Sequence, residues 1–410
     1  MEQLYKDPCV PRRMREGLLG ASVDAFAQQL IDQGYARTSI RYALQLLADF
    51  GRWLDRRRMQ VPQVTAECLA DYLRERSRRR RFRSGDAAIV SRLLSLLVEQ
   101  GIVAPPAPVE ATPAGRLLAE FRAYLEQERR LAPSSVLYYL EFARRFLAHV
   151  SPEDEVRLER LRAADVIRFV QKEAARLHAK RAKMMTTAVR SFLQYVRYRG
   201  LIETDLRTNV PTVANWSMAS LPNALSSDEV QRLLAGCKRE TAAGCRNWAI
   251  LLLLARLGLR AGEVVGLMLE DLDWATGEIS IRGAGTRSDQ LPMPQDVGEA
   301  LADYLCHVRP ACVSRRVFIR LRAPYRGFAS SAAISSLVQR ALEHAGLHPA
   351  HKGAHLLRHT VATQMLRQGA SLAEIGELLR HRCQQTTMIY AKVDLDLLRP
   401  LALPWPGGAS

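Results

Sequence analysis

The sequence predicts a mostly α-helical protein with one small antiparallel β-sheet in its C-terminal part. Leu and Phe recur at helical spacing over most of the chain before residue 208. GEISIR at 277–282 alternates like a half-buried strand, a turn follows, and QLPMP at 290–294 returns as a second strand. Two proline-rich stretches, 104–115 and 209–225, lack helical periodicity and are interpreted as linkers.

The linkers divide the chain into three predicted domains. A chain of 410 residues is too long for one ordinary core, so two or three domains are expected from length alone. We predict an N-terminal helical unit at 1–108, a second helical unit at 113–208 and a C-terminal domain at 225–410. Within the last, RVFIR at 316–320 is a possible third strand.

The first two units resemble each other in the order of their residues. Phe26 and Tyr42 correspond to Phe121 and Tyr138, and the offset grows slowly along the chain, as small loop insertions would produce. Unrelated amphipathic bundles would also share Leu and Phe at helical spacing. The matching order of Ser, Tyr and Gly favours an internal duplication of a four-helix unit.

The charge of the chain indicates a polyanionic partner. Lys and Arg number 59 against 42 acidic residues, which gives a formal net charge of +17. Nucleic acid is the simplest such partner, although a merely soluble basic protein is the alternative. The arginine run at 74–83 could be a solvated helix end or a phosphate contact. The residues expected to contact DNA are Arg78, Arg79, Arg80 and Arg81, and in a milder patch Lys180, Arg181 and Lys183.

Several features favour a cytoplasmic location. The first twenty residues have no apolar signal region. The most apolar run, 248–259, is interrupted by Arg256 and is too short to cross a bilayer. The seven cysteines are scattered without a CxxC pair, which fits reduced thiols better than disulfides or a zinc site.

HLLRHT at 355–360 holds a cluster of polar residues. His355, Arg358 and His359 have the spacing of one helix face. Two histidines four residues apart can bind zinc, but the protease motif needs a glutamate where Leu356 stands, and no third ligand has a recognisable spacing. We therefore expect a phosphate rather than a metal at this face.

Other segments supply the partners that a phosphate site needs. Arg260 and Glu263 lie in GLRAGE, His381 in LLRHR and Tyr390 in MIYAKVD. With His355 and Arg358, their order and separations resemble the motif of the tyrosine recombinases, the phage integrase family. The resemblance implies an integrase-type catalytic domain at 225–410 and a SAM-like, core-binding DNA domain at 113–208. The N-terminal unit would be a second SAM-like copy outside the minimal pattern.

The resemblance also implies a mechanism without metal, cofactor or ATP. Two guanidinium groups would hold the charge of the phosphate while a tyrosine attacks it, leaving a 3′-phosphotyrosine and a free 5′-hydroxyl. Histidines would support proton transfer, and the glutamate would orient an arginine. The residues implied as catalytic are Arg260, His355, Arg358, His381 and Tyr390, with Glu263 and His359 in supporting positions.

The implied partner is double-stranded DNA in a bacterial cytoplasm. The family exchanges strands between two recombination sites through a four-way junction. We expect a homo-tetramer or hetero-tetramer on DNA, and the recombinase of a mobile, transposable element.

One position departs from the family pattern. The hairpin turn reads RGAGTRSD, with Ala284 where the family carries a general-acid lysine. Arg287 or a water could substitute, the chain could have been altered, or it could be a naturally weak enzyme. A DNA-binding accessory subunit with a disabled site is the alternative function. A type IB-like topoisomerase is a third, disfavoured by the duplicated helical units.

Overall fold

The structure is a computed structural model. It describes residues 4–5, 7, 9–79, 83, 85–105, 112–151, 158–213, 222–282, 288–381 and 383–393, without the side chain of residue 79. Helices dominate these residues, and the strands among them form one three-stranded sheet. The predicted fold class is confirmed. The chain separates into two compact units, residues 104–219 and residues 1–103 with 220–410.

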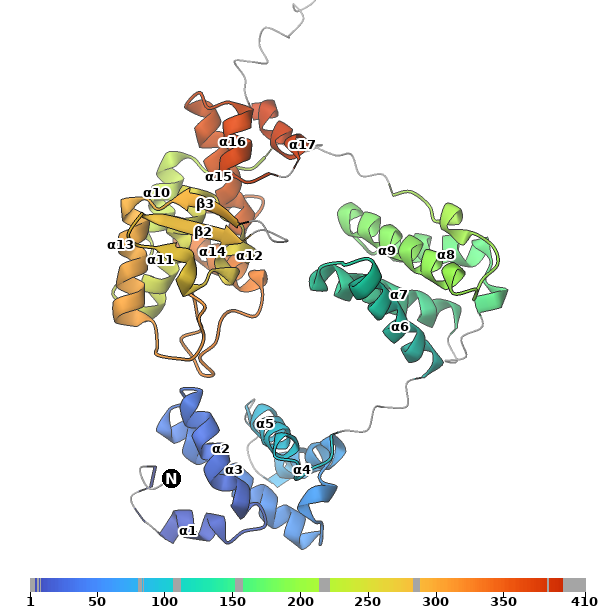
Figure 1. The fold of residues 1–410 in the computed structure, drawn as a ribbon, viewed down its shortest axis with the longest axis vertical. Coiled ribbons are helices and arrows are strands. Elements are labelled where there is room, and N and C mark those ends of the chain that lie inside the picture. The colour runs from blue at the N-terminus through green and yellow to red at the C-terminus, as the bar shows by residue number, and fades with distance from the viewer. Residues whose placement is uncertain are drawn as a thin grey trace, which may run out of the picture. The chain divides into compact units, whose positions relative to one another are not determined.

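The N-terminal region packs its helices around an aromatic core. Phe50 and Tyr72 lie at its centre with ring centroids 4.9 Å apart. The buried carboxylate of Asp86 accepts a hydrogen bond from Tyr42 (2.6 Å) and lies 3.7 Å from Arg76. The elements, in blue in Figure 1, are α1 (Cys9–Arg15), α2 (Gly20–Asp32), α3 (Arg37–Arg56), the 3-10 helix η1 (Val61–Gln63), α4 (Ala66–Arg79) and α5 (Asp86–Glu99).

Residues 112–213 form a second helical region with its own core. Phe121 is fully buried, as is Phe26, its predicted counterpart in the first region. At this pair, the proposed duplication matches one core residue with another. The elements are α6 (Pro113–Ala123), the π-helical turn η2 (Tyr124–Glu128), α7 (Pro133–Val150), η3 (Leu158–Arg160), α8 (Ala163–Ala174), α9 (Ala179–Tyr198) and η4 (Leu206–Asn209).

The C-terminal region contains the sheet. The strands β1 (Leu272–Asp273), β2 (Glu278–Arg282) and β3 (Ser288–Pro292) are antiparallel in the order β1-β2-β3, and Ile279 faces Leu291 across the hairpin. The possible strand at 316–320 was a wrong prediction. That segment makes isolated bridges to Met268 and Gly327, because its consecutive side chains from Val317 to Ile319 all enter the core.

Helices surround the sheet in this region, coloured yellow to red in Figure 1. Its central helix, α11, buries every residue from Ala249 to Leu254, so this part of the helix is apolar on all faces. No helix among the described residues has the length and apolar character to span a membrane. The helices are α10 (Ser227–Ala235), α11 (Ala242–Leu257), α12 (Ala261–Gly266), η5 (Leu269–Asp271), α13 (Gln295–Asp303), η6 (Tyr304–Val308), α14 (Ser331–His344), α15 (Ala354–Arg367), α16 (Leu372–Leu378), α17 (Gln384–Thr387) and η7 (Met388–Val393).

The end of α11 directs the chain into the candidate site. Gly258 ends the helix with a left-handed conformation, φ 57°, that favours glycine. A Cβ atom there would also lie 2.7 Å from a side-chain carbon of Leu379. Two residues later, Arg260 stands at the N-terminus of α12.

Candidate active site

Arg260 and Glu263 form a fixed ionic pair at the start of α12. The Glu263 carboxylate accepts hydrogen bonds from the Arg260 backbone N–H and from its Nη1, both at 2.7 Å. Burial alone would raise the pKa of Glu263. The Arg260 backbone hydrogen bond and the Arg380 and Arg260 charges outweigh burial and hold the pKa below its usual value. The carboxylate is therefore ionised and orients the Arg260 side chain, which is 40% exposed.

Arg358 is buried in α15, with 4% of its surface exposed. Its Nη1 donates to the carbonyl of Gly258 (2.6 Å), and its Nη2 donates to the carbonyl of Leu379. Burial, and then the charge of Arg260, lower the pKa of Arg358 to about 10. The side chain therefore remains a cation at neutral pH, held by backbone oxygens from two other segments.

Tyr390 and His359 contact each other in the core of the site. The Tyr390 hydroxyl shares a 2.9 Å hydrogen bond with Nδ1 of His359, and the rings meet edge to face. Burial raises the pKa of Tyr390 to about 12, although the charge of Arg358 opposes this shift. Burial, followed by the charges of His355 and Arg358, lowers the pKa of His359. A neutral phenol therefore lies beside a neutral imidazole that can accept its proton.

His381 also lies close to Tyr390. The two rings are nearly parallel, with centroids 6.5 Å apart, and Nδ1 of His381 contacts the hydroxyl of Thr387 at 2.7 Å. Burial and the charges of Arg358 and Arg260 lower the pKa of His381 to about 4. The imidazole is therefore neutral at physiological pH.

A cavity of about 1150 Å³ opens beside these residues. Arg260, His355 and His381 line it, whereas Arg358 and Tyr390 do not. The structure thus brings all five predicted residues into one neighbourhood but places only three of them at the cavity wall.

Comparison with known proteins gives the same assignment as the motif. The Phage integrase family matches residues 223–396, and the phage integrase N-terminal SAM-like domain matches residues 118–200. The chain is 46% identical to the protein named "Putative integrase/recombinase y4rA" of Sinorhizobium fredii, with 97% of each chain aligned. It is 30% identical to the tyrosine recombinase XerD of Mycobacterium tuberculosis, over 71% of this chain and 97% of XerD.

The chain belongs to the phage integrase family. It is a site-specific tyrosine recombinase, as predicted. Solved structures agree on the fold. The XerH recombinase bound to its palindromic difH substrate superimposes with a TM-score of 0.55 at 17% identity, over 82% of this chain and 94% of XerH. A λ integrase dimer bound to a core site gives 0.51 at 16% identity, over 67% of this chain and 94% of that chain.

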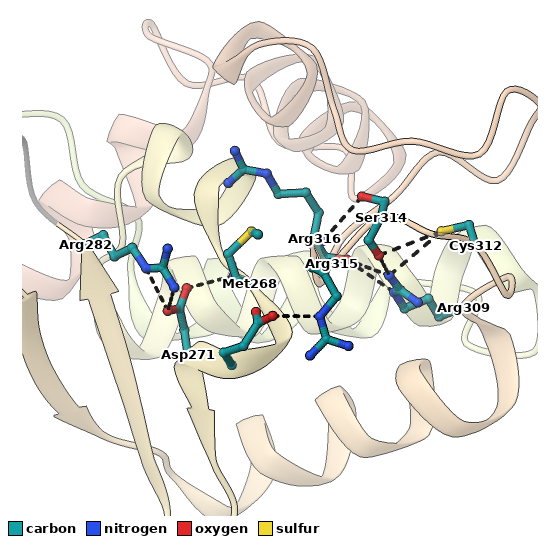
Figure 2. Close-up of polar contacts among 9 residues, drawn as sticks. Met268, Asp271, Arg282, Arg309, Cys312, Ser314, Arg315 and Arg316 are labelled. Atoms are coloured by element: carbon teal, nitrogen blue, oxygen red, sulfur yellow. Dashed lines mark hydrogen bonds and ion pairs between the residues drawn. The ribbon is translucent and has the colours of Figure 1, made fainter.

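The recombinase anchors the base of its β-hairpin at the cavity. Figure 2 shows Arg282, the last residue of β2, paired with the buried carboxylate of Asp271 at 2.7 Å. The other oxygen of Asp271 accepts the backbone N–H of Met268 (2.8 Å). Arg282 and Asp271 both line the cavity. The turn itself, with Ala284 and Arg287, lies outside the described residues.

Sequence reasoning missed Arg380. Its Nη2 donates to Glu263 (2.9 Å), so one carboxylate of the recombinase binds two guanidinium groups, and Arg380 also lines the cavity. The side chain is 7% exposed, its Nε has no hydrogen-bond partner among the described residues, and its backbone has φ 54°. Its position directly before His381 was the signal available in the sequence.

The residues predicted to contact DNA lie on helix ends of the two helical regions. Arg78 is exposed in the last turn of α4, and Lys180, Arg181 and Lys183 are exposed in the first turns of α9. Arg181 pairs with Glu141 at 3.3 Å. The side chain of Arg79, and all of Arg80 and Arg81, lie outside the described residues.

Proposed function

We propose that this recombinase cleaves and rejoins double-stranded DNA through a 3′-phosphotyrosine on Tyr390. One observation carries the proposal. Segments up to 130 residues apart in sequence bring Arg358 and Tyr390 close to Arg260 and His381, and the latter two line one cavity. The XerH and λ integrase structures hold DNA sites, and a net charge of +17 suits the same ligand.

The arginines would stabilise the pentacoordinate phosphate. Guanidinium groups fixed in advance cost no reorganisation when negative charge develops on the non-bridging oxygens. The bonds of Arg260 to Glu263 and of Arg358 to two carbonyls supply that fixation. His355 and His381, at the cavity wall, would donate hydrogen bonds to the same phosphate.

Tyr390 would attack phosphorus while its proton passes to Nδ1 of His359. The bond from phosphorus to the 5′-oxygen breaks, and that oxygen takes up a proton to become the free 5′-hydroxyl. The 2.9 Å contact makes His359, rather than His355, the acceptor in this proposal. Because Tyr390 does not line the cavity, its segment has to move toward the bound phosphate before the attack.

The leaving 5′-oxygen needs a proton donor, and the family lysine is absent at Ala284. Arg287 is the proposed substitute, although arginine is a weak acid. Loss of a general acid typically slows a step by about 10²- to 10⁴-fold. We therefore expect slow cleavage.

The three predicted domains would bind the recombination site together. Each has its own hydrophobic core, at 4–103, 117–210 and 225–357. The basic residues of the two helical regions would contact the phosphate backbone of the DNA. A homo-tetramer or hetero-tetramer would join two recombination sites through a four-way junction. The chain would be the recombinase of a mobile element.

The absence of the lysine favours a second candidate, an accessory subunit that binds DNA without cutting it. Nicked duplexes separate the two functions, because a nick beside the cleavage point traps the covalent intermediate. The site is first recovered by selecting bound duplexes from a random pool. Wild type should form a denaturation-resistant adduct that Tyr390→Phe abolishes. Absence of an adduct from wild type and from Ala284→Lys alike would establish the accessory role.

A further inference from the structure

A second cavity in the C-terminal region is lined by basic residues. It has a volume of about 680 Å³, and neither aspartate nor glutamate lies among its lining residues. Its basic side chains come from the loop before α11, from α11, from the loop after Ile319 and from α14. They are Lys238, Arg246, Arg320, Arg322, Arg340 and His344.

Most of these cations have no protein counter-ion. Among the described residues, Lys238, Arg320, Arg322 and Arg340 make no ion pair. Arg246 bonds only neutral oxygens, the side-chain oxygen of Asn247 (2.9 Å) and the carbonyl of Ile319 (3.2 Å). Burial, and also the charge of Arg340, lower its pKa. Gathering like charges without carboxylates costs free energy, which a bound anion would recover.

The N-terminus of α11 adds to the positive potential. This helix is 16 residues long, and its N-cap residue Thr241 lines the cavity together with Ala243 and Gly244 of its first turn. The first amides of a helix point outward and carry partial positive charge. A Cβ atom at Gly244 would lie 1.8 Å from the carbonyl oxygen of Lys238, so glycine lets the Lys238 loop pack against the helix end.

This cavity faces away from the active-site cavity. Ser331 and Ser335 of α14 line the first cavity, whereas Arg340 and His344 line the second. Arg340 follows Ser331 by nine residues, and His344 follows Ser335 by the same interval, which is about two and a half turns of helix. The two pairs therefore lie on opposite faces of α14, and a phosphate in the first cavity cannot reach the second.

We propose that the second cavity binds phosphate groups of a ligand other than the phosphodiester being cleaved. Such phosphates can come from the DNA backbone outside the cleavage point or from a free nucleoside triphosphate. A volume of about 680 Å³ accommodates either, because pockets for small molecules span roughly 300–1,000 Å³. Bidentate guanidinium contacts suit both.

The test compares two double variants that remove the same charge. Arg320→Gln with Arg340→Gln removes two cations of the cavity. The control, Arg256→Gln with Arg315→Gln, removes two exposed arginines that pair with Asp296 and Glu270 elsewhere in the same region. Thermal unfolding verifies that both variants are folded. Calorimetry then measures ATP binding, and fluorescence anisotropy measures duplex DNA affinity over a range of salt concentrations.

A free nucleotide as ligand predicts saturable ATP binding that weakens at least tenfold in the cavity variant and not in the control. The DNA backbone as ligand predicts instead that the slope of log affinity against log salt falls by about 2 in the cavity variant alone, since each lost phosphate contact contributes about 0.9. Equal behaviour of both variants toward ATP and DNA would refute the proposal. The covalent adduct on nicked DNA reports separately on the proposed function.

Discussion

The arginines of the two cavities in the C-terminal region differ in whether they have carboxylate partners. In the first cavity, the candidate active site, Arg260 and Arg380 share Glu263, and Arg282 pairs with Asp271. In the second cavity, described cations such as Arg320 and Arg340 have no carboxylate partner. Fixed cations suit catalysis, which gains from charges positioned before the reaction. Cations without a protein counter-ion suit binding, because an anionic ligand can pair with them.

Substitution of Arg358 should have the largest effect on the fixed arrangement. The ammonium of Arg358→Lys cannot reach the carbonyls of Gly258 and Leu379 together, so at least one buried carbonyl would lose its donor. We expect adduct formation on nicked DNA to fall by about 10³-fold and the free energy of unfolding by about 2–4 kcal/mol. Urea denaturation measures the second quantity. Arg315→Lys, at an exposed pair, is the control, and equal losses in both variants would contradict the assignment.

A lysine in the hairpin turn should act in the opposite direction. Ala284→Lys would restore a general acid, and we expect the rate of adduct formation to rise by about 10²-fold or more. Ala284→Arg adds the same charge with a much weaker acid, as Arg287 already is, and should raise the rate far less than Ala284→Lys does. Single-turnover kinetics on nicked DNA distinguish the two variants. A similar rise in both would show that charge, not proton donation, was missing.

Removal of the Glu263 charge would make the first cavity resemble the second. Glu263→Gln frees Arg260 and Arg380 from their shared partner, and we expect adduct formation to fall roughly 10- to 100-fold through lost positioning. The folded pKa of Glu263 lies below its usual 4.5. Its ionised form therefore stabilises the fold above pH 4.5, and this contribution is lost as the pH falls through the folded value. Glu263→Gln should lack that loss in urea titrations below pH 4.5.

His381 should titrate in a different window. Its pKa falls from 6.5 to about 4 in the folded protein, so the unfolded chain binds the extra proton between these values. Stability is therefore expected to decline as the pH falls from 6.5 to 4, and less so in His381→Gln. Unfolding midpoints across this range test the sign. A steeper decline in the variant would place the histidine outside the positive field of Arg358 and Arg260.

The sequence was sufficient to predict those candidate site residues that belong to the family's linear motif. Arg260, His355, Arg358, His381 and Tyr390 were predicted from the resemblance of their order and spacing to the tyrosine recombinase motif, and the structure brings them close together. Which side chains form hydrogen bonds with one another was not predictable from the sequence. That His359 meets the Tyr390 hydroxyl, and that Glu263 serves two arginines, depends on how α12, α15 and η7 pack. The basic cavity is invisible in the sequence for the same reason, since its cations come from four separate segments.

The smallest expected effects concern two arginines with left-handed backbones. Arg380 and Arg58 both have φ 54°, a conformation that favours glycine. Arg58 is exposed, so Arg58→Gly should raise the free energy of unfolding by about 0.5–1 kcal/mol and leave adduct formation unchanged. Arg380→Gly relieves the same backbone strain but removes a cation from Glu263. We expect no net stabilisation and about a tenfold slower adduct formation, because Arg260 would lose its fixed partner geometry. If both glycine variants behaved alike, Arg380 would only end a helix. Among the described arginines that line the first cavity, the fixed ones would then be Arg260 and Arg282.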